Sequence, residues 1–352
     1  TLWVSLETLT VSSYLLASFL KKDKASNEAG MKYLLLGAFS SAAMLLGFSY
    51  LYGLTGTTVL ANLARSLAAQ PTTPLLVLGV ILVIGGLSFK ISLAPFHMWT
   101  PDVYEGAPLP VTAFLSVVSK TAGFAAFTRI FWVGLSNSST LSVWEGLFAV
   151  LAVLSIILGN LEAIPQQSLK RLMAYSSIAQ AGYISTGFLA GGNLGLTAVL
   201  FYLFVYLFAN MGVFLAIAIL YAKTGSDRIE DVAGVWKRSP LIGVVLLVGL
   251  LSLAGVPPFA GFSGKWYLFG AAVHMGYTWL ALVGMVFSVI SLYYYLQVAR
   301  QALVSEPKDP SPVPVTPLES VVLLVSILTT VTLGFWPRPI MDLAQWAATS
   351  LF

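Results

Sequence analysis

The sequence contains no cysteine, only two histidines and little charge. Without cysteine the chain can form no disulfide, ligate no iron–sulfur cluster through thiolates and use no thiol nucleophile. The two histidines, His97 and His274, lie far apart and have no group of further ligands near them, which argues against a metal or haem site. The phosphate-binding turns GxxxxGK and GxGxxG are also missing. Any redox centre that serves this protein must therefore belong to a partner.

Charged residues make up 9% of the 352 residues, whereas soluble domains contain about 25%. Hydrophobic residues make up 58%, and the mean hydropathy is +0.87. Apolar runs of roughly 18 or more residues recur along the chain and predict an all-α polytopic membrane protein. The basic residues that raise the isoelectric point to about 9.1 lie mostly between these runs, so they indicate membrane topology rather than nucleic-acid binding.

Ten apolar segments are long enough, at about 20 residues each, to cross the hydrocarbon layer of a bilayer. They are residues 1–20, 30–52, 75–99, 110–133, 143–162, 169–190, 194–221, 239–275, 277–302 and 316–336. Two of them are interrupted, one around Pro95 and one around Pro257 and Pro258. Residues 305–317 form a proline-rich loop, and nothing divides residues 1–352 into separate globular domains. Because the chain starts with Thr1 inside an apolar run, we expect it to be N-terminally incomplete.

Alternation of the ten spans divides the loop cations unequally between the two sides of the membrane. Twelve fall on one side: Lys21, Lys22, Lys24, Lys32, Lys170, Arg171, Lys223, Arg228, Lys237, Arg238, Arg300 and Lys308. Three fall on the other: Arg65, Arg129 and Arg338. The positive-inside rule places the first side in the cytoplasm or stroma. Lysines near span ends, such as Lys170, are expected to reach the interface.

Three ionisable residues lie deep within separate spans. At about 1.5 Å per helical residue, Glu7 lies roughly 20 Å from the cytoplasmic end of its span. Lys90 and Lys120 lie about 14–15 Å from the ends of theirs, close to the middle of the bilayer. A central charged residue costs about 2.5–3.5 kcal/mol to insert, so residues in such places usually pair and act in ion or proton pathways.

One carboxylate cannot neutralise two ammonium groups. Glu7 can pair with Lys90 or with Lys120, and the remaining lysine must then meet water or lose its proton, since burial can lower a lysine pKa by up to about 3–5 units. The alternative is an ion pair that only fixes helix packing. The prolines favour the functional interpretation, because Pro95 frees backbone carbonyls that water or side chains must satisfy within the membrane.

The two interrupted spans resemble each other. LSFKISLAPF (residues 87–96) and LSLAGVPPF (residues 251–259) both run from Leu-Ser to Pro-Phe, and they lie five spans apart. An odd offset inverts one copy relative to the other, as in transporters built from inverted repeats with broken helices at the ion pathway. We therefore expect an inverted repeat with two broken helices.

Four stretches make the sequence recognisable: residues 26–56, 89–120, 159–183 and 251–269. They include FKISLAPFHMWTPDVYEGAP, GNLEAIPQQSLKRLMAYSSIAQAGY and LSLAGVPPFAGFSGKWYLF. These stretches resemble the chain 2 family of complex-I-type NAD(P)H–quinone oxidoreductases, which are antiporter-like membrane-arm subunits, and the resemblance covers essentially the whole chain. The uninterrupted YEGAPLPVTAF is most similar to the cyanobacterial and plastid branch, on its cyanobacterial side.

This resemblance implies fourteen helices in two inverted five-helix repeats, of which the chain would hold the fifth to the fourteenth. It also implies roles for individual residues. Glu7 in SLETL resembles the glutamate of the fifth helix, and Lys90 resembles the lysine of the broken seventh helix. Lys120 in VVSKTAGF resembles the central lysine of the eighth helix, and Lys265 in GFSGKWYLF resembles the lysine after the break in the twelfth. His97 can either bridge the pathway through water or line the helix mouth.

The implied function is that of a proton-translocating subunit of a quinone oxidoreductase, with no cofactor in this chain. The resemblance implies iron–sulfur clusters and plastoquinone in other subunits. It also implies further antiporter-like chains as partners and a cyanobacterial thylakoid membrane as the location, while NAD(P)H and ferredoxin both remain possible electron donors. The alternatives are a cation/proton antiporter subunit and a non-pumping structural scaffold. The tyrosines, such as Tyr294 and Tyr295, are expected to serve packing or the membrane interface.

Overall fold

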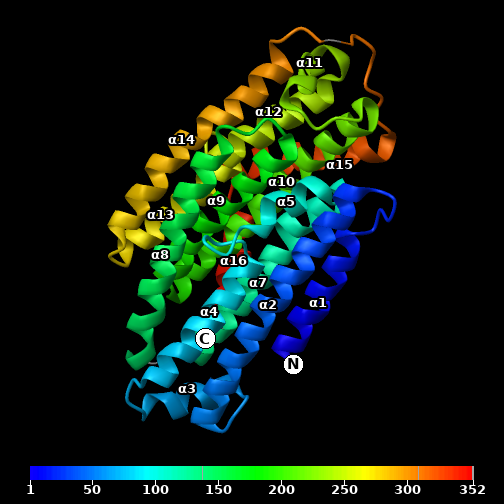
Figure 1. Ribbon diagram of the computed structural model, residues 1–352. Coiled ribbons are helices and arrows are strands. Elements are labelled where there is room, and N and C mark those ends of the chain that lie inside the picture. The colour runs from blue at the N-terminus through cyan, green and yellow to red at the C-terminus, as the bar shows by residue number, and fades with distance from the viewer. Residues whose placement is uncertain (137, 308, 351–352) are drawn as a thin grey trace.

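The apolar runs fold as long helices that lie side by side along one axis (Figure 1). The computed structural model describes residues 1–136, 138–307 and 309–350. The long helices are α1 (Leu2–Ala17), α2 (Lys24–Thr55), α4 (Pro74–Lys90), α8 (Ser138–Ala163), α9 (Leu169–Ala190), α10 (Gly192–Thr224), α12 (Pro240–Ala254), α13 (Ala260–His274), α14 (Thr278–Leu303) and α15 (Pro317–Phe335). Over the described ranges there is no β-strand, and the predicted all-α class is confirmed.

Shorter elements join and complete the long helices. They are α3 (Leu60–Ala68), α5 (Trp99–Gly106), α6 (Leu109–Phe114), the π-helical η1 (Leu115–Ser119), α7 (Lys120–Phe127), the π-helical η2 (Thr128–Gly134), the 3₁₀-helical η3 (Ile229–Val232), α11 (Val235–Arg238) and α16 (Arg338–Thr349). The sequence analysis did not predict α3 or α16. Both are short and amphipathic, so they lack the long apolar run by which the other spans were found.

Each of the ten predicted spans coincides with helix, although the boundaries differ by several residues. Six helical segments are long and apolar enough to cross a membrane, and α1, α4 and α12 are shorter apolar helices. Helix α9 is not in either group because it is richer in polar residues. Nearly all of its residues are buried among other helices, and such a central helix can carry polar side chains that lipid would not tolerate.

The first broken span ends earlier than predicted. Helix α4 stops at Lys90, five residues before Pro95, and residues 91–98 are not helical. Proline lacks the amide hydrogen that would bond to the carbonyl of Ile91, and its ring would clash with that carbonyl. The depth of Lys90 could therefore not be obtained by counting helical residues back from Trp99.

The two breaks have the same backbone geometry. The N–H of Leu93 donates to the carbonyl of Ser88 at 2.9 Å, and the N–H of Val256 donates to that of Leu251 at 3.0 Å. This six-residue closure belongs to a Schellman motif, which requires a left-handed residue after the helix. Those residues are Ser92, with φ of 63°, and Gly255, with φ of 85°. They follow Ile91, the C-cap of α4, and Ala254, the last residue of α12.

This match aligns the two repeats at their Pro-Phe ends and shows that their Leu-Ser pairs are offset by one residue. Ser92 corresponds to Gly255, so Pro95 corresponds to Pro258 and Ser88 to Leu251, not to Ser252. The two half-helices also start from opposite ends of the bundle. Helix α4 begins beside α3 at one end, and α12 begins beside α11 at the other (Figure 1). The opposed directions agree with an inverted repeat.

Polar contacts gather most of the predicted cytoplasmic loops at one end of the bundle. Lys32 pairs with Asp102 at 2.6 Å, and Asp102 also pairs with Arg171 at 3.0 Å. Further along the chain, Lys237 pairs with Glu306 at 2.7 Å. Lys308 lies outside the described residues. The proline-rich loop belongs to the same end and is anchored there, because Val313 N–H donates to the carbonyl of Arg238.

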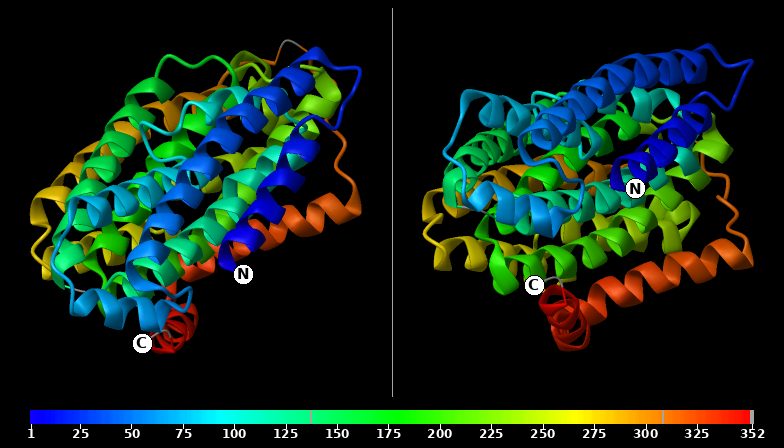
Figure 2. Two further views of the ribbon diagram at one scale, coloured as in Figure 1. Left: turned by 60° about the horizontal axis from the view of Figure 1, so that its bottom comes forward. Right: turned by 90° about the horizontal axis from the view of Figure 1, so that it is seen from below.

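The opposite end carries α3 and the start of α16, and Figure 2 shows α15 running along one side of the bundle towards α16. Helices α15 and α16 pack mainly against α10. The buried core is continuous through the bundle, and one large cluster of apolar residues includes members of most helices. This core fixes the depths at which the charged side chains can lie.

Candidate functional site

Glu7 and Lys90 form an ion pair in the interior of the first half of the chain. The Lys90 Nζ atom lies 3.0 Å from Glu7 Oε1, and the two side chains are 5% and 17% exposed. The sequence left the partner of Glu7 open between Lys90 and Lys120, and the structure selects Lys90. Glu7 was predicted to lie slightly deeper than the lysine, but the contact places both at one depth.

Two hydroxyl groups complete this ion pair. Lys90 donates to Thr10 Oγ1 at 2.5 Å and to Ser41 Oγ at 3.3 Å, and Ser41 donates to Glu7 Oε1 at 2.8 Å. Thr10 lies one turn after Glu7 on α1, Ser41 is on α2, and Lys90 ends α4. Three helices thus supply one compact group of charges, in which each of the three ammonium hydrogens of Lys90 has an acceptor.

The break beside Lys90 contains buried hydroxyl groups without a protein partner. The side chains of Ser88, Ser92 and Thr100 are fully buried, and their oxygen atoms accept or donate no hydrogen bond within the described residues. Buried polar groups in folded proteins nearly always have a partner, and internal water supplies it where protein does not. These hydroxyl groups therefore mark positions for water at the break.

Lys120 lies in a different environment, without a carboxylate. It begins α7 directly after the π-helical η1, and its side chain is 1% exposed. Its Nζ atom donates to the backbone carbonyl of Ser177 on α9. Short π-helical insertions occur frequently at functional sites because they leave backbone groups available and shift side chains round the helix. No salt bridge involving Lys120 occurs in residues 1–136, 138–307 and 309–350.

Helix α9 carries the polar connection from Lys120 towards the second half of the chain. Gln180 follows Ser177 by three residues and therefore lies on the same helix face. Its amide donates to the carbonyl of Leu253 at 2.9 Å, and its Oε1 accepts from Tyr202 at 2.5 Å. Lys265 donates to the same Leu253 carbonyl at 2.9 Å. One backbone oxygen at the second break is thus shared by Gln180 and Lys265.

Lys265 places its ammonium group at the second break and binds the backbone carbonyls there. Its Nζ atom donates to the carbonyls of Leu253 and Ala254, at 2.9 and 3.0 Å, and to Ser288 Oγ at 2.8 Å. These carbonyls belong to the interrupted end of α12, where no helical amide reaches them. Lys265 is 3% exposed and lies five residues into α13. Its burial is consistent with the role that the family resemblance implies.

A groove of about 580 Å³ between α13 and α14 reaches Lys265 from the outer surface. Most of its lining is apolar and includes Trp266, Phe269 and Met285. Lys265 and Ser288 are the polar side chains at its base. The groove therefore leads from the lateral surface of the bundle to an ammonium group that lacks a carboxylate partner among the described residues.

Sequence reasoning missed the neutral polar residues that link the lysines. Tyr294 and Tyr295 were assigned to packing or the membrane interface, and both do pack in the buried core, but their hydroxyl groups also form hydrogen bonds that were not predicted. Both are fully buried; Tyr294 donates to Asn160 at 3.1 Å, and Tyr295 shares a hydrogen bond of 2.5 Å with Ser176. Ser176 and Gln180 lie four residues apart on α9. This helical spacing of polar residues was the signal that could have revealed the network.

The two histidines lie outside this network. His97 is partly buried, and its Nδ1 atom is buried without a hydrogen-bond partner within the described chain. No hydrogen bond between described residues joins its side chain to Lys90 or Lys120. Its proposed bridging role therefore stays a prediction that requires water. His274 ends α13 and is exposed, at the position predicted for an interfacial residue.

Charges also cluster where α5 meets α2 and α9. Asp102 pairs with Lys32 and Arg171, and Arg171 pairs with Glu105 at 2.7 Å. Burial opposes ionisation of Asp102, but the hydrogen bonds from Lys32 and Arg171 outweigh it and hold the pKa of Asp102 below its ordinary value. Lys170 was predicted to extend to the interface. Instead it is 7% exposed and donates to the carbonyl of Glu105 at 3.0 Å.

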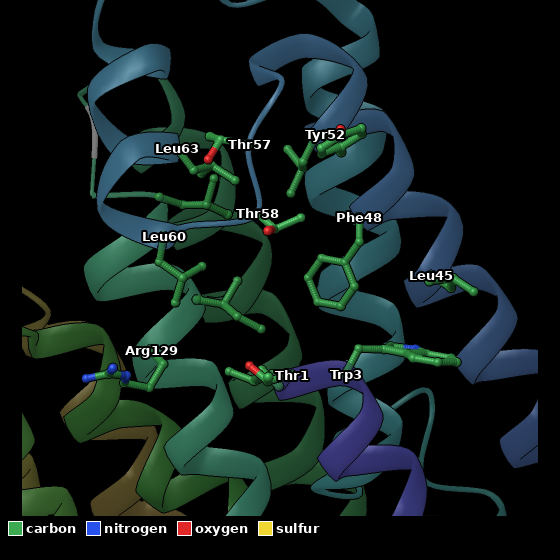
Figure 3. Close-up of a pocket in the computed structure, with 14 residues that line it drawn as sticks. Thr1, Trp3, Leu45, Phe48, Tyr52, Thr57, Thr58, Leu60, Leu63 and Arg129 are labelled. Atoms are coloured by element: carbon green, nitrogen blue, oxygen red, sulfur yellow. The ribbon is translucent and has the colours of Figure 1, made fainter.

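A second cavity, of about 340 Å³, lies at the opposite end of the bundle (Figure 3). Figure 3 shows Trp3 and Phe48 among the side chains that line it, with Arg129 at its margin. Among the described residues that line it, Arg129 carries the one charged side chain, and Tyr52 adds a phenol hydroxyl. A mainly apolar cavity with one arginine does not offer the paired acids and bases that proton transfer requires.

Comparison with known sequences agrees with this architecture. The family model described as "NADH:quinone oxidoreductase/Mrp antiporter, TM" matches residues 1–291. The "NADH-quinone oxidoreductase subunit N" of Moorella thermoacetica is 48% identical over 352 residues, which is 100% of this chain and 74% of that protein. The "NAD(P)H-quinone oxidoreductase subunit 2" of Thermosynechococcus vestitus is 50% identical over 311 residues, which is 88% of this chain and 60% of that protein.

Comparison of structures gives the same result. A chain of the respiratory complex I from Thermus thermophilus with bound aureothin superposes with a TM-score of 0.83 at 36% sequence identity. The match covers 97% of this chain and 74% of that chain. The matches thus span 74% of the Moorella and Thermus chains and 60% of the Thermosynechococcus chain.

Proposed function

Because this chain belongs to the family of membrane subunits shared by NADH:quinone oxidoreductases and Mrp antiporters, we propose that it translocates protons as an antiporter-like membrane-arm subunit of a quinone oxidoreductase. One observation carries the proposal. A buried Glu7–Lys90 pair and two buried lysines that have no carboxylate partner within the described chain lie beside broken or π-helical segments. Such groups are costly in a membrane and mark proton or ion pathways.

We propose a part for each group. Glu7 and Lys90 form the input pair, because moving the carboxylate away exposes Lys90 to loss of its proton. Lys120 is the central relay, since among the described residues it is held by a backbone carbonyl and can exchange a proton without breaking an ion pair. Lys265 is the exchange point, since its ammonium group lies at the second break and lines the groove between α13 and α14. A charge change at one group alters the proton affinity of the next through Coulomb interaction, which is strong where water is scarce.

The linking residues are neutral. Gln180 and the tyrosines around it can form hydrogen bonds and orient water, but amide and phenol side chains are uncharged at neutral pH. The proton therefore rests on the lysines and on Glu7 and crosses the regions between them through water. The buried, unpartnered hydroxyl groups of Ser88, Ser92 and Thr100 support water at the first break.

The finer features of the complex are part of this proposal. We place quinone reduction and the iron–sulfur clusters in other subunits, because this chain has no cysteine to hold a cluster. The similarity to cyanobacterial subunits supports plastoquinone as the acceptor and a thylakoid membrane as the location. The similarity to the subunit from Moorella extends over the whole chain and supports a bacterial respiratory complex equally. Identification of the quinone extracted with the purified complex distinguishes these two forms.

Two alternatives remain testable. The family description includes Mrp antiporters, and a cation/proton antiporter subunit would exchange Na⁺ for protons across vesicles without quinone. The identity of 48% to a quinone oxidoreductase subunit favours the quinone-linked function. A structural scaffold would use the charges only to fix helix contacts. The environment of Lys120 argues against it, because a lysine held by one carbonyl adds desolvation cost and no ion pair.

The test is Lys90→Met in the assembled complex, reconstituted into vesicles. Proton uptake and quinone reduction should both fall, because the input pair is lost while the methionine retains the apolar bulk of the lysine stem. The matched control is Lys237→Met, which breaks the exposed ion pair with Glu306 and should leave both rates unchanged. If Lys90→Met assembles and pumps at the wild-type rate, the pair serves packing alone.

A further inference from the structure

We infer that the contact between α5 and α9 is the path by which a cytoplasmic proton reaches Lys120, with Tyr104 as a relay residue and the Asp102–Arg171–Lys32 group closing its outer end. This inference rests on the proposed function. It assigns new roles to four residues of the chain, and each of those roles follows from contacts in the structure.

The outer end of the path is closed by charges from three helices. Asp102 on α5 accepts from Lys32 on α2 at 2.6 Å and from Arg171 on α9 at 3.0 Å. Arg171 also pairs with Glu105 at 2.7 Å, and Lys170 donates to the Glu105 carbonyl at 3.0 Å. Asp102, Arg171 and Lys32 retain partial exposure, so water from the cytoplasmic side reaches them.

The inner end of the path is made by the same two helices. Tyr104, two residues after Asp102, is fully buried, and its hydroxyl lies 3.4 Å from Ser177 Oγ on α9. The carbonyl of Ser177 is the acceptor for Lys120. Ser177 follows Arg171 by six residues, which is about 9 Å along a helix. One short contact between two helices thus connects the charged surface with the buried amine.

Helix α5 is suited to this position because it is the separate second part of the broken span. The break at residues 91–98 detaches it from α4, so its location depends on side-chain contacts with α2 and α9. Gly106 at its end permits very close packing, since an added Cβ atom would lie 2.5 Å from the Ala25 carbonyl oxygen of α2. The charged group and this close packing together hold α5 across the path.

The proton balance of the step is simple. A proton that arrives from the cytoplasmic side through water inside the path binds the buried Tyr104 hydroxyl as that hydroxyl gives its own proton to the Ser177 hydroxyl. Ser177 passes one on, through water, to the neutral amine of Lys120. Each hydroxyl gains one proton and releases one, so only Lys120 changes its charge, from amine to ammonium. The carboxylate and guanidinium groups at the outer end are positioning residues and carry no proton in this step.

The experiment compares two variants in the intact complex, reconstituted into vesicles and normalised to assembled complex. Asp102→Asn combined with Glu105→Gln removes both carboxylates that bind Arg171. We expect a several-fold faster passive decay of an imposed pH gradient and a lower number of protons pumped per quinone reduced, with quinone reduction maintained. Glu306→Gln, which breaks the exposed pair with Lys237 at the same end, is the control and should change neither value.

Tyr104→Phe tests the inner end, because it removes only the hydroxyl. We expect slower proton uptake and slower coupled quinone reduction, without a leak. Tyr221→Phe is the control, since it keeps the ring beneath Lys170 at the same end of the bundle. A purely structural role for Tyr104 would instead lower the amount of assembled complex and leave the rates per complex unchanged.

Two results overturn the inference: a Tyr104→Phe complex with wild-type uptake, or a carboxylate double variant with a wild-type leak and ratio. Should the double variant fail to assemble, Tyr104→Phe decides alone. Lys120→Met measured alongside separates this inference from the proposed function. If Lys120→Met is defective and Tyr104→Phe is normal, protons reach Lys120 by another path. If Lys120→Met itself pumps normally, the proposed function fails.

Discussion

The pairing of Glu7 with Lys90, and not with Lys120, decides which lysine depends on a carboxylate. Lys90 has one charged partner and two hydroxyl partners, whereas Lys120 is bound by one carbonyl. The distinction could not be made from the sequence, because it depends on how α1, α2 and α4 pack. The presence of three deep charges could be predicted, since each interrupts an apolar run.

Replacement of Glu7 tests whether its charge or only its hydrogen bonds matter. Glu7→Gln keeps the size of the side chain and removes the charge, and loss of one partner of a buried ion pair costs about 3–5 kcal/mol when the other stays charged. Glu7→Asp keeps the charge with a shorter side chain. We expect Glu7→Asp to retain more proton uptake and quinone reduction per assembled complex. Equal activity of the two variants would show that the carboxylate charge has no part in the mechanism.

The neutral residues of the network show what single residues in a sequence do not reveal. Ser177, Gln180 and Tyr202 are common residue types, and their importance appears only when α9 packs against α8, α10 and α13. The recurrence of Ser177 and Gln180 on one face of α9 was available as a pattern. The carbonyl of Leu253, which Gln180 and Lys265 share, was not, because backbone groups at a break have no signature in the side-chain sequence.

At the scale of the helices, the sequence predicted the positions of the two breaks but not their backbone conformation. Proline excluded continuous helix at both places. The Schellman geometry, the left-handed Ser92 and the one-residue shift between the repeats depend on backbone hydrogen bonds. Lys90 therefore lies at the helix end itself, where the sequence had placed it inside a helix that continued to Pro95.

Close packing around the second break gives a prediction for α13. An added Cβ atom at Gly261 would lie 1.8 Å from the Ser252 carbonyl oxygen, whereas one at Gly270 would meet nothing within 4 Å. Overpacking of this kind typically costs about 1–3 kcal/mol. Gly261→Ala should therefore lower the thermal stability and yield of the complex, and Gly270→Ala should not. The thermal unfolding midpoints of the two purified variant complexes provide the measurement, and identical midpoints would contradict the packing described.

The attachment of α5 has a defined pH dependence. The pKa of Asp102 in the folded protein lies below its ordinary value of about 3.9, so its ion pairs stabilise the fold fully above that value. This contribution is lost only as pH falls through the lower folded pKa. We expect the difference in proton leak between wild type and Asp102→Asn to be constant between about pH 6 and pH 8. A difference that disappears at the lower end of this range would assign the effect to another titrating group.

For the whole molecule, the order of the spans could be predicted from composition, because long apolar runs are a local property, and the loop cations predict their sidedness. The short amphipathic α3 and α16, and the anchoring of the proline-rich loop through Val313, required the folded structure. Asn137 lies outside the described residues.

The absence of native cysteine allows the sidedness to be tested by single-cysteine labelling. Asn27→Cys lies at the cation-rich end and should react with a membrane-impermeant maleimide from the cytoplasmic side. Asn137→Cys should react from the other side; Ser136→Cys, a described and exposed neighbour, serves the same purpose. Labelling of both ends from one side would overturn the assigned topology.

The most direct test of proton translocation is Lys120→Met in vesicles that contain the intact complex. Lys120 has no carboxylate partner among the described residues, so its replacement breaks no ion pair, and the methionine fills the same apolar space. The measured quantity is the rate of proton uptake per assembled complex during quinone reduction. We predict that the complex assembles normally and that proton uptake falls steeply. An assembled Lys120→Met complex that pumps at the wild-type rate would contradict the account.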